Sequence, residues 1–124
     1  MHTFSFEKLI AWNEARLLTK NIYKITKTFP DEERFGLTNQ LRKALISVCS
    51  NLAEGSSRVH SKEQSQFYQI SYSSLMESLN QIIISFDLDY IDLQTYETIR
   101  SDVEKCSRLI NSLRNSTRKI PGKD

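Results

Sequence analysis

A chain of 124 residues with a net charge of +2 is long enough for one domain around a single hydrophobic core. It holds three glycines and two prolines, which leaves few places where a strand could turn, so long helices are expected. No apolar run approaches the roughly 20 residues of a membrane span, and the start lacks the order of a signal peptide, which argues against membrane and exported proteins.

Charge is segregated along the chain. Residues 1–58 carry a net +3, residues 59–104 carry −6 and residues 105–124 carry +5. Such a distribution suits nucleic-acid binding, or contact between the acidic region of one subunit and the basic region of another, and composition leaves both open. Cys49 and Cys106 fall beside apolar helical positions and not in a Cys-x-x-Cys pair, so we interpret them as reduced core residues of a cytoplasmic protein.

The first predicted helix runs from about Glu7 to Thr28, with an apolar face that begins at Leu9 and closes at Phe29. Its other side carries cations at spacings of four, four and three, which places them in one row. The row consists of Arg16, Lys20, Lys24 and Lys27. It is either a solvated helix face or a face that contacts phosphates.

Pro30 ends the first helix, and the second is predicted between Phe35 and Arg58 with a stop at Gly55. A wholly polar stripe runs beside the apolar stripe of this second helix. The polar stripe consists of Gln40, Ser47, Asn51, Glu54 and Arg58. Because a core helix seldom needs an ordered polar row beside its core row, this stripe indicates a role beyond burial.

The third helix is predicted to begin at Ser61, where Ser-x-x-Gln has the form of a capping box, and to run to about Phe86. Its apolar side includes Ile70. A row of small side chains would let a neighbouring helix approach closely. That row is Ser71, Ser74 and Ser78.

Asp92 is a natural N-cap for a fourth helix, which carries apolar residues from Leu93 to Leu113 and ends near Asn115 or Arg118. Four helices of about twenty residues with short links predict an all-α fold, an up-down-up-down antiparallel four-helix bundle. We place this bundle domain at residues 1–118 and a flexible C-terminal tail at residues 119–124.

Several stretches of the chain are recognisable together. They are residues 29–44 (Phe-Pro-Asp-Glu-Glu-Arg-Phe-Gly-Leu-Thr-Asn-Gln-Leu-Arg-Lys-Ala), Ser47, residues 51–58 (Asn-Leu-Ala-Glu-Gly-Ser-Ser-Arg), residues 73–79 (Ser-Ser-Leu-Met-Glu-Ser-Leu), Tyr90-Ile91 and the opening at residues 6–12. The combination closely resembles the bacterial four-helix-bundle family named after the intervening-sequence protein, which is encoded by insertions within large-subunit ribosomal RNA genes. The likeness covers nearly the whole chain.

The resemblance implies a ring-shaped homo-oligomer, most simply a homopentamer, and a connection with ribosomal RNA or the ribosome. The bundle is also similar to the accessory protein of diversity-generating retroelements, a basic pentamer that works with a reverse transcriptase and nucleic acid. This chain departs from that relative because it is only mildly basic, and its third helix together with the surrounding residues is acidic.

An enzyme would have to start from Glu54 and Glu77, which could face each other across the second and third helices. A di-iron bundle needs Glu-x-x-His on two helices, and the histidines of this chain, His2 and His60, do not follow that pattern. The sequence also shows no glycine-rich phosphate loop, zinc-ligand cluster or nucleophile with a histidine at motif spacing. We expect no catalytic residues, no metal and no cofactor.

Polar side chains of the second and third helices are instead expected to bond between helices or across a subunit interface, where they would fix register and oligomer geometry. These candidates are Gln40, Arg42, Asn51, Glu54, Arg58 and Glu77.

Two hypotheses of function remain. In the first, the oligomer combines cations of several subunits into one basic surface that binds RNA or ribosomal components, with an affinity that falls steeply with salt. The candidate contacts are Arg16, Lys20, Lys24, Lys27, Arg114, Arg118 and Lys119. In the second, the bundle is a structural scaffold or adaptor for a protein partner and does not bind nucleic acid.

Overall fold

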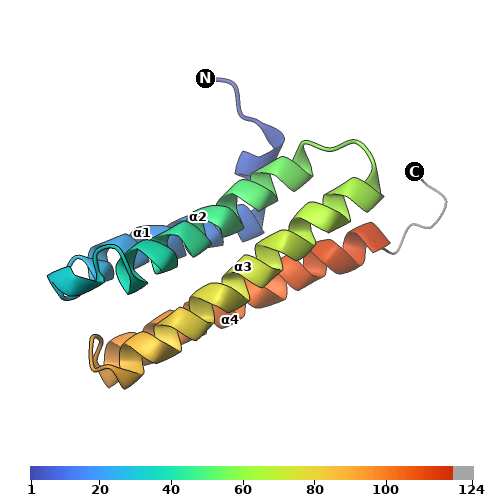
Figure 1. The fold of residues 1–124 in the computed structure, drawn as a ribbon. Coiled ribbons are helices and arrows are strands. Elements are labelled where there is room, and N and C mark those ends of the chain that lie inside the picture. Colours follow the sequence, from blue (N-terminus) through green and yellow to red (C-terminus); the bar gives the residue numbers. More distant parts are fainter. Residues whose placement is uncertain (119–124) are drawn as a thin grey trace.

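The computed structural model describes residues 1–118 and forms a bundle of antiparallel helices (Figure 1). Its elements in order are the 3-10 turn η1 (Ser5–Lys8), helix α1 (Ile10–Thr26), the 3-10 turn η2 (Asp31–Glu33), and helices α2 (Leu37–Ser56), α3 (Ser61–Asp87) and α4 (Leu93–Arg118). Each helix packs against its neighbour in the chain, and α4 returns to α1. The predicted all-α four-helix bundle is confirmed. The predicted tail, residues 119–124, lies outside the described residues.

The core consists of one buried side from each helix. Leu18, Leu45, Leu75 and Ile110 come from α1, α2, α3 and α4 in turn, and each is at most 1% exposed. Burial of a side chain of this size stabilises the fold by about 1.5–3 kcal/mol. The periodicity predicted these faces, although Ile70 and Leu93, which the pattern assigned to the apolar sides of α3 and α4, are 47% and 57% exposed.

The first predicted helix is divided in two. Leu9 has extended backbone angles and separates η1 from α1. The side-chain amide of Asn13 donates to the carbonyl oxygens of Glu7 and Leu9, at 2.9 and 3.0 Å, and so satisfies acceptors at the break. In this arrangement the ring of Phe6 packs edge-on against Trp12.

The small side chains of α3 lie in its contact with α2, which is the most extensive helix contact of the bundle. Ser71 is fully buried and donates from Oγ to the carbonyl oxygen of Val48 over 2.8 Å. The hydroxyl oxygens of Ser47 and Ser74 lie 2.8 Å apart in the same seam. The close approach predicted from the serine spacing is therefore confirmed.

Gly55 does not act as a stop signal. It is buried in the last turn of α2, which continues to Ser56. A Cβ atom at Gly55 would lie 2.6 Å from Cε1 of Tyr68 and 3.1 Å from Cβ of Phe67. The glycine therefore makes room for the buried Tyr68 ring of α3.

The ends of α3 and α4 are close to those predicted. Ser61 is the first helical residue of α3, with His60 as the N-cap, and the Gln64 side chain donates to the carbonyl oxygen of Arg58 over 2.9 Å. At α4, the carboxylate of Asp92 accepts the backbone N–H of Thr95 at 2.8 Å, which confirms the predicted cap. Hydrogen bonds from Thr95 lower the pKa of Asp92.

Glu33 joins the start of α2 to the α3–α4 link, which lies at the same end of the bundle (Figure 1). One oxygen of its carboxylate accepts the Leu37 N–H at the start of α2, at 3.1 Å. The other accepts the Tyr90 hydroxyl in the link between α3 and α4, at 2.8 Å, and this bond raises the pKa of Tyr90. Glu33 therefore caps α2 and holds the α3–α4 link against it.

Candidate nucleic-acid and subunit interfaces

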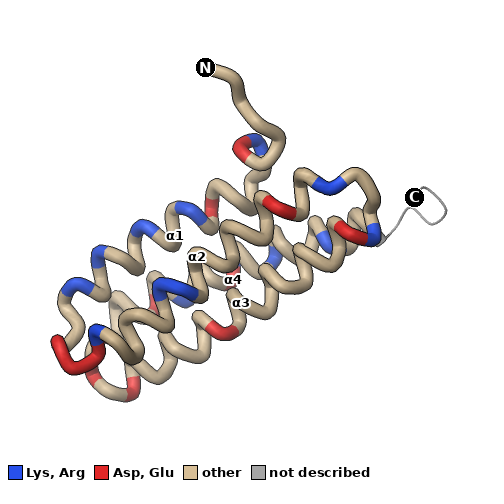
Figure 2. The backbone as a smooth tube through the Cα atoms, turned by 45° about the horizontal axis from the view of Figure 1, so that its top comes forward, with Lys and Arg blue, Asp and Glu red and all other residues tan. Residues whose placement is uncertain are grey.

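Three cations of α1 and Lys27, the residue that follows this helix, form what we call the basic row: Arg16, Lys20, Lys24 and Lys27, all exposed. Figure 2 shows cations following one another along α1. Within residues 1–118, none of the four forms an ion pair with a carboxylate. The guanidinium of Arg16 lies 5.2 Å from the ring centre of Trp12, while the three lysines extend into solvent. The row can therefore receive anions without first breaking internal ion pairs.

The remaining predicted phosphate contacts do not join this row. Arg114 is half-buried against α3, where its guanidinium bonds to Gln69 and lies 4.9 Å from the ring centre of Tyr72. Arg118 is the last residue of α4 and its side chain is outside the described part, as is the whole of Lys119. The structure therefore brings together the four cations of the basic row and directs Arg114 to the other side of α4.

The predicted polar row of α2 and α3 divides into three parts. At one end, the Arg58 guanidinium pairs with Glu54 at 3.0 Å and lies 4.9 Å from the ring centre of Phe67. The side chains of Arg58 and Glu54 are 40% and 49% exposed. An exposed pair at this spacing contributes a few tenths of a kcal/mol, about 0.3–0.5.

The middle of the row connects the two helices. The amide of Asn51 donates to the carbonyl oxygen of Ser47 at 2.8 Å and to its hydroxyl at 3.1 Å. The hydroxyl of Ser47 in turn meets that of Ser74 on α3. Asn51 thus bonds within α2 and is linked to α3 only through Ser47, whereas the sequence predicted a bond between helices or across a subunit interface.

At the other end lies Gln81, which the sequence analysis missed. It is 4% exposed, and its amide nitrogen makes long contacts of 3.5 Å to Gln40 Oε1 and 3.4 Å to Glu77 Oε1. Its own Oε1 is buried without a hydrogen-bond partner among residues 1–118. The sequence feature that could have identified Gln81 is its position four residues after Glu77, on the side of α3 that faces α2.

Arg42 lies on the opposite side of α2 from this row. Its Nε donates to Thr26 Oγ1 at 2.8 Å and its Nη2 to the Tyr23 carbonyl oxygen at 3.2 Å. The guanidinium also lies 4.5 Å from the ring centre of Tyr23. Arg42 therefore holds the last turn of α1 against α2, where a cation also suits the helix dipole.

The described residues offer little for catalysis. The thiols of Cys49 and Cys106 are free, and burial raises the pKa of both, that of Cys106 to about 12, so neither is an activated nucleophile. No group of three or more His, Cys, Asp or Glu side chains within residues 1–118 could hold a metal ion. A membrane-spanning helix is likewise not found in this part of the chain.

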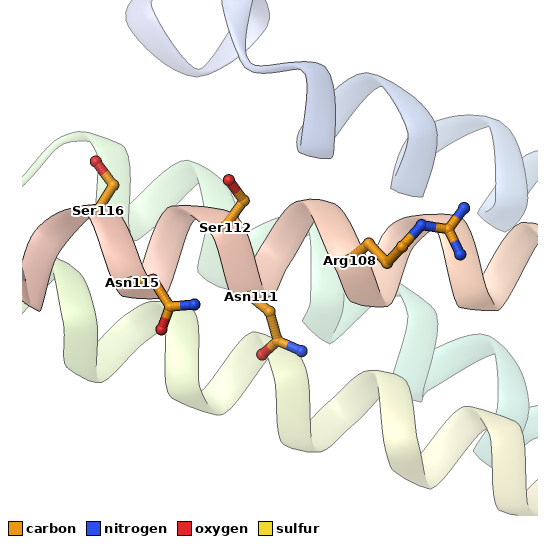
Figure 3. Close-up of a pocket in the computed structure, with 5 residues that line it drawn as sticks. All are labelled: Arg108, Asn111, Ser112, Asn115 and Ser116. Atoms are coloured by element: carbon orange, nitrogen blue, oxygen red, sulfur yellow. The ribbon is translucent and has the colours of Figure 1, made fainter.

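One hollow of about 550 Å³ is lined by polar side chains that all project from α4 (Figure 3). They are Arg108, Asn111, Ser112, Asn115 and Ser116. Because one helix supplies the whole lining, no second wall encloses a ligand, and the hollow is an open polar surface of α4.

Comparisons with known proteins agree with this fold. A family model described as the 23S rRNA-intervening sequence protein matches residues 7–112. No curated protein matches the chain. Among solved structures, the chain is similar to a protein of unknown function from the S23 ribosomal protein family of Bacteroides thetaiotaomicron, with 17% identity and a TM-score of 0.79 over 86% of this chain and 96% of that one. At this identity the likeness concerns the fold alone.

Proposed function

Because the chain belongs to the 23S rRNA-intervening sequence protein family, we propose that it is a non-enzymatic, homo-oligomeric bundle of the cytoplasm that binds RNA or ribosomal components. The contact surface in this proposal is the basic row of α1. The family name is the reason for proposing a connection with ribosomal RNA. The arrangement of charge is the reason for proposing this surface.

The observation that carries the proposal is a row of exposed cations that have no carboxylate partner among residues 1–118. From Arg16 to Lys27 the row extends about 16 Å along the helix axis. A few phosphate contacts are weak alone, but an oligomer engages several rows at once. Since Trp12 and Tyr23, the aromatic residues beside the row, are half-buried, the surface suits the RNA backbone or its shape better than stacked bases.

The test is the affinity of a fluorescently labelled RNA hairpin, measured by anisotropy at several salt concentrations. Replacing Lys20, Lys24 and Lys27 with Glu should abolish binding and leave the oligomer intact. The matched control replaces the same three lysines with Arg, which keeps the charge and should keep the affinity and the salt dependence. Each phosphate contact contributes about 0.7–0.9 to the slope of log K against log salt, so the Arg variant and the unmodified chain should share one slope. If the Glu variant binds the hairpin with unchanged affinity, the basic row is not the RNA-binding surface.

The oligomer is tested by light scattering after size exclusion at low and high salt, with the absorbance ratio reporting nucleic acid. The proposal expects a mass of several subunits, and RNA that leaves the protein as salt rises. A mass of one subunit at every concentration would contradict it.

A scaffold for a protein partner is the second candidate, and it is favoured by apolar side chains on the exposed side of α1. Ile10 and Leu17 are 67% and 53% exposed there. A protein-only oligomer of constant mass at both salts, with no affinity for the hairpin, would support this candidate over the first.

A further inference from the structure

We infer that copies of this chain meet through two complementary edges, the exposed edge of α2 in one copy and the exposed edge of α3 in the next, with Lys43 opposite Glu77. The inference rests on the proposed homo-oligomer and names its contact surfaces. Its occupant is a second copy, because the two edges carry opposite charges and both expose isoleucine.

The α2 edge is a row on the side of α2 that faces away from the core. Its members are Asn39, Lys43, Ile46 and Ser50, all exposed and spaced by four, three and four. Ile46 is 47% exposed. Lys43 is the cation of this edge and forms no ion pair within residues 1–118.

The α3 edge has the same character with the opposite charge. Its members are Ile70, Ser73, Glu77 and Ile84, all exposed and spaced by three, four and seven. The two isoleucines are 47% and 39% exposed. Glu77 is the carboxylate of this edge, and it too lacks an ion pair in the described chain. One charge among apolar and small polar side chains is typical of a protein–protein contact, which is poor in charged residues at its centre.

The two charges lie at the same height along the bundle. Lys43 stands between Gln40 and Ser47 on α2, one turn from each. Those two side chains contact Gln81 and Ser74 of α3.

Glu77 stands between the same two partners on α3, three residues after Ser74 and four before Gln81. When the α2 edge of a second copy lies beside the α3 edge at equal height, its Lys43 therefore meets Glu77. The exposed isoleucines of the two edges then share the same contact.

An unsatisfied acceptor marks the same place. Gln81 Oε1 is buried without a donor among the described residues, and the amide nitrogen of Gln81 makes only the long contacts to Gln40 and Glu77. An ammonium group brings three N–H donors. Lys43 of a second copy would thus add donors at Glu77, one turn from the unsatisfied oxygen.

The two edges belong to neighbouring helices of the bundle, α2 and α3 (Figure 1). A contact in which the α2 edge of each copy meets only the α3 edge of the next is heterologous, and a contact of this type forms a ring when the rotation closes.

The test compares the subunit number of five variants with that of the unmodified chain by light scattering over a dilution series. Lys43→Glu and Glu77→Lys each place like charges opposite one another and should raise the concentration at half-assembly by about tenfold or more. The double exchange, K43E with E77K, restores opposite charges and should recover assembly. Arg108→Glu and Glu97→Lys, exposed charge reversals on α4, are matched controls that should assemble as the unmodified chain does.

The possible outcomes separate the two proposals. A monomeric unmodified chain would overturn the homo-oligomer and this inference together. An oligomer that both single variants leave unchanged, or that the double exchange does not recover, would overturn the inference alone. Because Lys43 and Glu77 are exposed, helix content by circular dichroism should stay constant across the series. If a single variant loses helix content and the double exchange recovers both helix content and assembly, the two charges act within one copy, and the inference is overturned.

Discussion

Replacing Gly55 with Ala tests the close contact between α2 and the Tyr68 ring of α3. Two effects of opposite sign compete at this position. Alanine favours a helix over glycine by about 1 kcal/mol, which stabilises the fold. The added Cβ would lie 2.6 Å from Cε1 and 2.9 Å from Cδ1 of Tyr68, and this ring is 3% exposed. An overpacked core site costs typically about 1–3 kcal/mol.

The steric cost should win, because Phe67 Cβ, 3.1 Å from the same point, limits movement of the added methyl group away from the ring. We expect Gly55→Ala to lower the free energy of unfolding by about 1 kcal/mol, which is the overpacking cost less the gain in helix propensity. For a chain of this length the midpoint of thermal unfolding should fall by about 4 °C.

The assay is thermal and urea unfolding followed by circular dichroism at one fixed protein concentration, because the stability of an oligomer depends on concentration. Ser101, exposed on α4, provides the control: its Ala variant should be more stable than its Gly variant by about 1 kcal/mol. Tyr68→Leu should reduce the cost of the alanine at Gly55, a coupling visible in a double-mutant cycle. Gly55→Ala could instead stabilise the fold by as much as the Ala variant at Ser101 exceeds the Gly variant in stability. In that case the Tyr68 ring does not require a glycine at position 55.

Three further predictions separate residues that the sequence grouped together. Asn51→Ala should lower the free energy of unfolding by about 1 kcal/mol in urea titrations, because both hydrogen bonds to Ser47 are lost, whereas Glu54→Ala should change it by less than about 0.5 kcal/mol; equal effects would contradict this ranking. Arg42→Lys should cost about 1–2 kcal/mol, since an ammonium cannot reproduce both hydrogen bonds and the stacking, and a neutral result by the same titration would show that charge suffices. Asp92 has a lowered pKa in the folded chain, so its stabilising contribution is present above the ordinary value of 3.8 and is lost as the pH falls below it. Asp92→Asn should therefore weaken the fall in the free energy of unfolding at acid pH. If the fall is as steep in the variant as in the unmodified chain, Asp92 does not cause it.

Much of the fold followed from local chemistry. Pro30 and Asp92 mark the end of α1 and the start of α4 because a missing N–H and a capping carboxylate act within one turn. The buried faces followed from helical periodicity. The division at Leu9 did not, since it depends on Asn13 reaching back to carbonyl oxygens that a continuous helix would have used. Gly55 was assigned the wrong role because the reason for it, the Tyr68 ring, lies on another helix.

In the candidate sites, too, features that depend on one helix were predictable and features that depend on packing between helices were not. The basic row was predictable because its spacing on a single helix is enough to align the cations. The partners of Arg42, Arg114 and Gln81 depend on which helices are neighbours and at what register, and sequence spacing contains neither. Arg42 accordingly faces α1, and Arg114 faces α3.

The return of α4 to α1 has a consequence for how the bundle opens. The other three pairs of packed helices are consecutive in the chain and joined by short links. Helices α1 and α4 come from opposite ends of the described chain, and their contact is the smallest of the four helix–helix contacts. Hollows lie along it, lined by residues such as Lys24, Ile25 and Thr95. Amide hydrogens of α1 should therefore exchange with solvent well before those of the α2–α3 pair. The helix that carries the basic row is then the one that detaches at the lowest free energy, while the α2–α3 pair stays folded.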